Sequence, residues 1–191
     1  KLLFKDFLTE YNSRSISKEI KISHAGAFKI LKKLEKKEIA NSKAIGKAII
    51  YSMNLNNPVA CKEIEMALTI EAQNYKRWLE EFRDLEDKAE FAILFGSILI
   101  NEKHANDIDI LVVSEPKNFK NIKKIINERK KVSNKRIHLI LQNPKDFKRD
   151  IMEKNRATIE IIKRGIALFG QEKLRRLVTI WPIYQTSLNG V

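Results

Sequence analysis

The sequence predicts an α+β protein with a helical N-terminal part and a C-terminal part built on a mixed sheet. Up to residue 57, helical apolar periodicity is followed by two short strand-like runs around a glycine. From residue 89, short apolar runs of strand length alternate with amphipathic helical stretches. The intervening pattern is helical throughout. We therefore expect two domains, residues 1–57 and 89–191, joined by a helical connector over 58–88.

Two short helices are expected at the N-terminus. Residues 1–11 place their leucines and phenylalanines on one helical face, which predicts a helix there. A second helix is expected over Ile16–Ile20. Ser13 or Ser15 would cap it, because a serine hydroxyl accepts a hydrogen bond from the free N–H groups of a first turn.

A third helix and a β-hairpin follow. Ser23 is a suitable N-cap for a helix that runs to about Lys37 and carries lysines along one side. Residues 39–51 form two short runs with Gly46 between them, a pattern typical of a hairpin with glycine at its tip. The order helix, helix, turn, helix, hairpin over residues 14–51 resembles that of winged helix-turn-helix domains.

This resemblance implies binding to duplex DNA. The first residues of such a recognition helix contact base edges, whereas lysines farther along and on the hairpin contact phosphates. The charge agrees, because the chain has a net charge of +13 and residues 1–57 carry 12 Lys and Arg against 5 Asp and Glu. The alternative is a protein-interaction module whose lysines form an ordinary solvated face. The predicted DNA contacts are Ser23, His24, Lys29, Lys32, Lys43 and Lys47.

The most informative motif of the C-terminal part is a Gly-Ser pair followed by two aspartates. Gly96-Ser97 ends one apolar run, and Asp107 and Asp109 open the next, Ile108–Val113. Alternate residues of a strand point the same way, so both carboxylates are expected on one face. Such a pair can hold Mg²⁺, which takes nucleotide phosphates as further ligands, while the glycine lets the backbone approach a triphosphate.

This motif resembles the signature of the DNA polymerase β nucleotidyltransferase superfamily, in particular its minimal prokaryotic members. The resemblance covers about residues 89–142, and Ile161–Gly170 is similar to the C-terminal end of those proteins. It implies Mg²⁺-dependent transfer of a nucleotide from an NTP to a hydroxyl acceptor, with release of pyrophosphate. The implied site comprises Asp107 and Asp109 as metal ligands and catalytic residues, and Gly96 and Ser97 as nucleotide contacts.

The sequence departs from this family pattern at two places. Many active members have a third carboxylate on a later strand, expected here over Arg136–Leu141, and His138 stands at that position. The Ala-Arg-Gly that usually follows the serine is replaced by Leu99-Ile100-Asn101. His138 is either a catalytic base, since its ordinary pKa is near neutral, or a residue of a degenerate site. A transferase and a DNA-binding regulator or antitoxin-like protein therefore both stay open.

The remaining elements are predicted from apolar spacing and charge. Lysines and arginines crowd residues 117–136, where they face either an acidic acceptor or only solvent. A tail helix carrying Leu174, Leu177, Ile180 and Trp181 is expected to stop at Pro182. The other expectations are a strand over Phe91–Phe95, helices over Phe119–Ile126, Phe147–Met152 and Ala157–Lys163, and a short apolar stretch at Ile166–Phe169.

Cysteine usage and hydropathy bound the cellular context. The single cysteine, Cys61, permits no intramolecular disulfide, which agrees with a reducing cytoplasm. No apolar run is long enough to span a bilayer, so we expect a cytoplasmic protein with no membrane partner. The expected partners are an NTP, duplex DNA and an RNA, protein or small-molecule acceptor. By analogy with other winged helices, the connector would join two copies into a homodimer.

Overall fold

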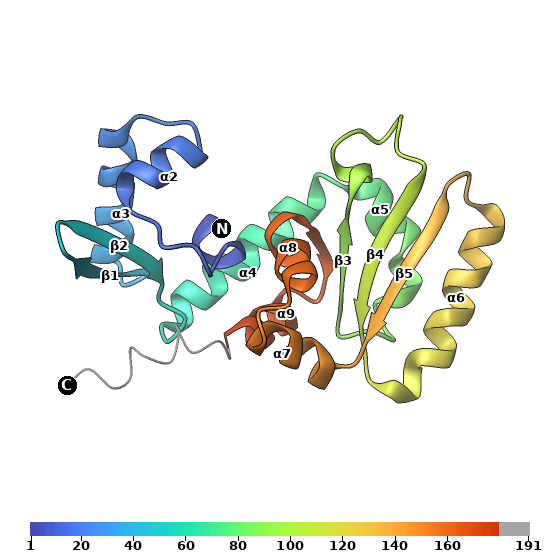
Figure 1. Ribbon diagram of the computed structural model, residues 1–191. Coiled ribbons are helices and arrows are strands. Elements are labelled where there is room, and N and C mark those ends of the chain that lie inside the picture. The colour runs from blue at the N-terminus through green and yellow to red at the C-terminus, as the bar shows by residue number, and fades with distance from the viewer. Residues whose placement is uncertain (180–191) are drawn as a thin grey trace. The chain divides into compact units, whose positions relative to one another are not determined.

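The computed structural model describes residues 1–179 and has the α+β architecture that the sequence predicts (Figure 1). The chain forms two compact units, the first covering Lys1–Ile64 and the second beginning at Glu65. The first unit contains a two-stranded sheet and the second a four-stranded sheet. The division into separate domains at 1–57 and 89–191 stays a prediction.

Three helices and an antiparallel hairpin, followed by the start of a longer helix, form the first unit. In chain order they are α1 (Leu2–Lys5), α2 (Ser13–Glu19), α3 (His24–Lys36), β1 (Ala40–Ile45) and β2 (Ala48–Met53). Gly46 lies at the hairpin tip with a φ of 59°, in the left-handed region that glycine tolerates best. This order is compatible with a winged helix, and α3 begins directly after Ser23, as expected.

The helix expected over residues 1–11 is wrong beyond its first turn. Helix α1 ends at Lys5, and Tyr11 instead forms an antiparallel bridge with Tyr51. The Tyr51 N–H donates to the Tyr11 carbonyl at 2.8 Å. Phe7 and Tyr11 are nevertheless buried, so their apolar character reflects tertiary packing rather than helical periodicity.

The predicted start and cap of the second helix are also wrong. Helix α2 begins at Ser13, three residues earlier than expected, and its N-cap is Asn12. The Asn12 side chain accepts from the Ser15 N–H at 2.9 Å, and the Ser15 hydroxyl accepts from the Asn12 N–H at 2.9 Å. This reciprocal capping box satisfies two free donors at once, which a serine cap alone does not do.

The helical stretch after Pro58 is broken into three parts. It consists of α4 (Pro58–Gln73), α5 (Lys76–Glu81) and the 3₁₀ turn η1 (Arg83–Leu85). Trp78 and Phe82 lie one helical turn apart, are buried, and stack with their ring centroids 6.5 Å apart.

The second unit is organised around a mixed four-stranded sheet (Figure 1). Its strands are β3 (Phe91–Phe95), β4 (Asp107–Val113), β5 (Arg136–Gln142) and β6 (Ile166–Phe169), in the order β5-β4-β3-β6. Strand β3 is antiparallel to β4 and β6, whereas β4 and β5 are parallel and are connected through α6 (Phe119–Val132). The short apolar stretch noted in the sequence is thus an edge strand.

The remaining helices of the second unit are η2 (Ser97–Leu99), η3 (Pro116–Asn118), α7 (Pro144–Met152), α8 (Arg156–Arg164) and α9 (Gln171–Val178). Among them, α7 and α8 match the predicted stretches with bounds extended by a few residues, whereas the 3₁₀ turns η2 and η3 were not predicted. Helix α9 contains the Leu174 and Leu177 of the expected tail helix. Ile180, Trp181 and Pro182, also part of that expectation, lie outside the described residues.

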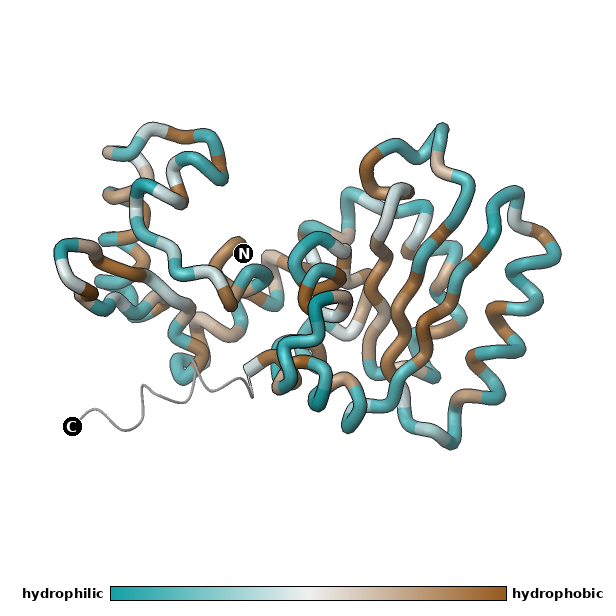
Figure 2. Tube along the Cα trace, in the orientation of Figure 1, coloured by the Kyte–Doolittle hydropathy of each residue, from teal (hydrophilic) through white to brown (hydrophobic). Residues whose placement is uncertain are grey.

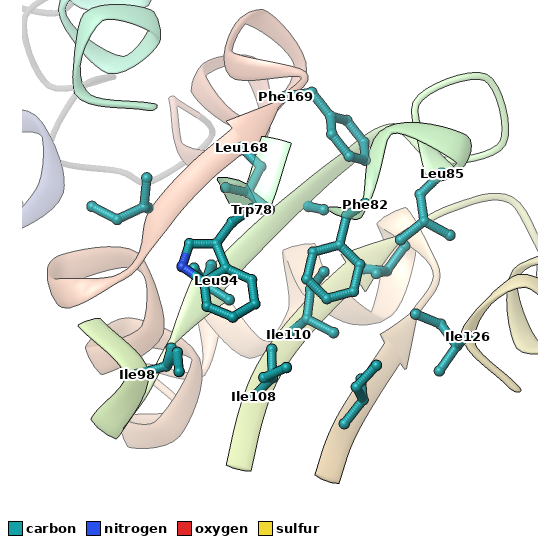
Figure 3. Packing of buried hydrophobic residues seen from close by; sticks show 14 of the residues in the cluster. Trp78, Phe82, Leu85, Leu94, Ile98, Ile108, Ile110, Ile126, Leu168 and Phe169 are labelled. Carbon is teal, nitrogen blue, oxygen red and sulfur yellow. The ribbon is translucent and has the colours of Figure 1, made fainter. Parts of the chain in front are cut away.

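The two aspartates lie on the sheet face opposite one buried cluster, and farther along their own face Leu111 and Val113 are buried too. Trp78, Phe82, Leu94 and Ile110 belong to one buried cluster, and Figure 3 shows the two aromatic rings packed over the strands. Hydrophobic residues are concentrated on the central strands in Figure 2. Ile108 and Ile110 face this cluster. Because side chains alternate along a strand, Asp107 and Asp109 face the opposite side of the sheet. Over residues 1–179, no helix combines the length and apolar character that crossing a membrane requires.

Candidate functional site

Asp107 and Asp109 occupy the first and third positions of β4, on the face opposite the buried cluster. The intervening Ile108 points into that cluster, which places both carboxylates together on the other side. Their side chains keep 29% and 25% of their surface exposed. The pair is therefore held by a buried strand and remains open to a ligand.

Strand β5 places two nitrogen-bearing side chains beside these carboxylates. Its parallel register sets Arg136 beside Asp107 and His138 beside Asp109. Arg136 Nε donates to Asp107 Oδ1 at 2.9 Å, and His138 Nδ1 lies 3.2 Å from Asp109 Oδ1. His138 Nε2 lies 3.9 Å from Asp107 Oδ1. The sequence reasoning missed Arg136, although its place two residues before His138 puts both on one strand face.

Gly96 lies directly against one of the carboxylates. Phe95, the last residue of β3, pairs with Asp109, so the chain leaves the strand beside that residue. Gly96 has a φ of +83°, and a Cβ there would overlap Asp109 Oδ2 and lie 3.1 Å from its Cγ. Only glycine fits both the backbone conformation and this approach.

Ser97 follows at the start of η2 and is exposed. Its carbonyl accepts from the N–H groups of Ile100 and Asn101, both at 3.0 Å, which fixes the turn. Its hydroxyl has no hydrogen-bond partner within residues 1–179 and is free to donate to a ligand. The structure therefore gathers the four residues that the motif singled out, together with His138, at one end of β3, β4 and β5.

The two aspartates are the residues that suit a divalent cation. Among the described residues, His, Cys, Asp and Glu form no group of three or more that could hold a metal ion. Mg²⁺ needs fewer protein ligands, because it binds through one or two carboxylates and takes substrate phosphates and waters as the rest. The exposed edges of Asp107 and Asp109 fit that requirement. Each carboxylate already has one partner from β5, Arg136 for Asp107 and His138 for Asp109.

The residues predicted to contact DNA lie on α3, at its cap and on the hairpin. The Ser23 hydroxyl accepts from the Gly26 N–H at 3.1 Å, which confirms it as the N-cap. His24 Nε2 lies 2.9 Å from the Ser13 hydroxyl, so α2 orients this ring. Lys32 is paired with Glu35 at 2.8 Å. All six predicted contacts are exposed, including Lys29, Lys43 and Lys47.

Two large apolar residues of α3 are not in the core. Phe28 and Ile30 keep 43% and 50% of their surface exposed, whereas Ala27 and Leu31 fill the inner side of the helix. Ile45 and Ile49 on the hairpin are exposed as well. Sequence periodicity could not separate these groups, because the apolar residues of α3 spread over more than one face.

Comparison with known proteins adds one match. No curated protein and no solved structure matches the chain. Residues 75–168 match the family model described as "Nucleotidyltransferase domain". The matched segment begins before α5 and ends within β6, so it contains the two aspartates, Gly96, Ser97 and His138. By this match, residues 75–168 carry a nucleotidyltransferase-type domain, and the paired carboxylates lie inside it.

Proposed function

We propose that the protein transfers a nucleotide from an NTP to a hydroxyl acceptor and releases pyrophosphate. The observation that supports this most directly is the arrangement around Asp109. Its carboxylate lies beside that of Asp107 on one strand face, and the Gly96 backbone lies against it. A nucleotide that binds beside Gly96 therefore places its phosphates next to two carboxylates.

The residues of the chain have separable roles in this reaction. Ser97 and the backbone N–H groups near Gly96 donate to the triphosphate. The acceptor oxygen forms a bond to the α-phosphorus as the bond to pyrophosphate breaks, and His138 takes the acceptor proton. Mg²⁺ held by Asp107 and Asp109 would neutralise the charge that develops on the phosphates.

Before a nucleotide binds, the positive charge of Arg136 offsets part of the negative charge of the two carboxylates. Its guanidinium bonds Asp107 while 76% of its side chain remains exposed. Exposed ion pairs contribute only about 0–1 kcal/mol, so this contact yields readily to a stronger ligand. Once displaced, the guanidinium is within reach of the phosphates of the bound nucleotide.

Nucleotide transfer is tested by incubating the protein with each α-³²P-labelled NTP and Mg²⁺, alone and with cell extract, and separating the products on a gel. A labelled protein or RNA band is expected, and it should be absent for the double variant Asp107→Asn with Asp109→Asn. The control is Glu86→Gln with Asp87→Asn, which removes the same charge from exposed positions. A folded protein that labels no acceptor under any condition contradicts the proposal.

We further propose that the first unit binds duplex DNA through α3 and the hairpin. Lys29, Lys33 and Lys36 share the outer side of α3, and all three are exposed. Lysines on an exposed helix face attract phosphates and release counterions. The exposed Phe28 and Ile30 beside them support the other hypothesis, a protein partner.

The DNA proposal is tested by fluorescence anisotropy with labelled duplexes of random sequence at several salt concentrations. Lys29→Gln with Lys33→Gln is expected to weaken binding about tenfold and to reduce the salt slope by about 2. Lys18→Gln with Lys21→Gln, on exposed positions outside α3, is the matched control. Equal losses in both variants would mean that only net charge matters. DNA binding without nucleotide transfer would identify a regulator.

A further inference from the structure

We infer that Arg136 makes the carboxylates of Asp107 and Asp109 selective for a divalent cation that arrives bound to a triphosphate, and that it disfavours the free cation. This inference rests on the proposed transfer function and specifies the form in which metal and nucleotide enter the site. The contact that carries it joins the first residues of β4 and β5.

The pairing of the two strands sets a positive charge against Asp107. The parallel register of β4 and β5 puts Arg136 directly beside Asp107, and the Arg136 N–H donates to the Asn106 carbonyl at 3.2 Å. Arg136 Nε donates to Asp107 Oδ1 at 2.9 Å. The backbone of the sheet therefore determines that a guanidinium begins beside one of the two acids that suit a cation.

The same strand also engages Asp109. His138 Nδ1 lies 3.2 Å from Asp109 Oδ1, and His138 Nε2 lies 3.9 Å from Asp107 Oδ1. The Oδ1 atoms of both acids are therefore directed at nitrogen-bearing side chains of β5. A cation that binds the two acids through these atoms must replace Arg136 as the partner of Asp107.

A free cation gains little from this replacement. Mg²⁺ keeps several of its waters and uses only one or two protein carboxylates, so substrate phosphates supply much of its binding. Close to Asp107 it also meets the positive charge of the guanidinium, and like charges repel. Among the residues that the structure describes, no third acid, histidine or cysteine completes a cluster that could hold a metal ion. A cation without a nucleotide should therefore bind weakly.

A triphosphate removes both obstacles. Beside Gly96 and Ser97, it supplies the phosphate oxygens that complete the ligands of the cation. It also gives Arg136 a new anionic partner, because a guanidinium can pair with a phosphate through two parallel hydrogen bonds. The Arg136 side chain is 76% exposed, so few packed neighbours hold it against Asp107.

The result is a coupling between cation and nucleotide that Arg136 provides. Each ligand should strengthen the binding of the other by the same factor, because the coupling between two binding equilibria is reciprocal. Arginine suits this role since its guanidinium stays charged at every physiological pH. The carboxylate pair thus accepts the metal–nucleotide complex in preference to either component alone.

The first experiment measures Mn²⁺ binding to the full chain by electron paramagnetic resonance without nucleotide. Mn²⁺ is the probe because it accepts the same oxygen ligands as Mg²⁺. Arg136→Gln should bind Mn²⁺ about tenfold more tightly than the unchanged protein, a factor within the usual range of binding couplings. Arg136→Lys keeps the charge and should gain far less. Adding Asp107→Asn and Asp109→Asn to Arg136→Gln should abolish the gain, which assigns it to this site.

A second experiment measures the nucleotide. It follows binding, with Mg²⁺, of a fluorescent NTP analogue whose α and β phosphates are joined by a methylene group, so that no transfer occurs. Arg136→Gln should weaken this binding about tenfold, because a charged hydrogen bond to phosphate is lost. The two affinities therefore shift in opposite directions, whereas a purely structural defect would weaken both.

The matched control is Arg149→Gln, which removes the same charge from an exposed arginine of α7 that pairs with Asp146 at 3.1 Å. It should leave both affinities nearly unchanged, because exposed charges are screened by salt. An unchanged Mn²⁺ affinity in Arg136→Gln, an equal gain in Arg149→Gln, or weaker binding of both ligands would overturn the inference. Neither experiment contains an acceptor, so opposite shifts without any transfer would contradict the proposed function and leave the role of Arg136 standing.

Discussion

The carboxylate of Asp109 occupies the space in which a side chain on Gly96 would begin. A Cβ built on Gly96 would overlap Asp109 Oδ2, and the φ of Gly96 is +83°. The end of β3 and the beginning of β4 are therefore joined through a contact that only glycine permits. This contact orients the Asp109 carboxylate and brings the backbone of Gly96 beside it. Gly96 therefore both positions the carboxylate and leaves room for a nucleotide to approach the backbone.

Replacing Gly96 with alanine should abolish nucleotide binding and destabilise the second unit. The new Cβ displaces the Asp109 carboxylate, and the positive φ adds strain of about 1–3 kcal/mol. Urea unfolding measures the stability loss, and titration with an NTP and Mg²⁺ measures binding. Gly46→Ala is the control, because φ is also positive but no atom lies within 4 Å of the added Cβ. Gly46→Ala should leave nucleotide binding unchanged; an equal binding loss in both variants would contradict the role of the Asp109 contact.

Replacing His138 with aspartate should strengthen the response to Mg²⁺. The new carboxylate stands beside Asp109 in the parallel register, so three acids share one edge. Without metal, like-charge repulsion should lower the free energy of unfolding by up to about 1 kcal/mol. With Mg²⁺ at about 100 times its Kd, binding should add about 2.7 kcal/mol. Thermal unfolding with and without Mg²⁺ measures both effects. At the same Mg²⁺ concentration, His138→Gln should show no repulsion and only the smaller stabilisation that Asp107 and Asp109 provide. An unchanged Mg²⁺ response would argue that these acids do not hold the ion.

The ion pair between Arg175 and Glu65 should stabilise the second unit far more than the nearby ion pair between Arg176 and Glu172 does. Arg175 Nε bonds Glu65 Oε1 at 2.7 Å, and the side chains are only 13% and 12% exposed. Arg175→Met should cost about 3–5 kcal/mol, because it removes the cation that bonds a buried carboxylate. Arg176→Met, one residue along, breaks an exposed pair with Glu172 and should cost less than about 1 kcal/mol. Chemical denaturation of both variants compares them directly, and similar costs would refute the distinction.

The first unit should lose stability above about pH 10. The Tyr11 hydroxyl donates to Asp6 Oδ2 at 2.6 Å inside the unit. Burial and the Asp6 carboxylate raise the pKa of Tyr11 well above its ordinary value. A raised folded-state pKa contributes stability that is complete below the unfolded pKa, about 10, and declines as the pH rises above it.

The measurement is urea unfolding between pH 8 and pH 11, followed through NMR signals of the first unit. Tyr11→Phe should remove the part of the pH slope that begins near pH 10. It should also cost about 1–3 kcal/mol at neutral pH, because it removes a buried hydrogen bond to a carboxylate. Thr9→Val is the comparison, since Thr9 bonds the other Asp6 oxygen without titrating. A slope that survives in Tyr11→Phe would assign it to another group.

Local signals in the sequence predicted most of the regular elements. Ser23 caps its helix as expected because an N-cap depends on residues within one turn. The strands β3 and β4 were predicted from short, mainly apolar runs of strand length. The first helix was overestimated for the opposite reason. Phe7 and Tyr11 are buried by packing against residues outside a helix. Apolar spacing in the sequence cannot distinguish such packing from the buried face of a helix.

The sequence by itself determined the α+β class and the pair Asp107 and Asp109, because strand alternation puts both acids on one face whatever lies around them. Tertiary structure alone decided what meets those acids. Arg136 and His138 reach them only through the parallel register of β4 and β5, and Gly96 only through the pairing of β3 with β4. Periodicity describes one strand at a time, whereas register depends on how separate segments pack together.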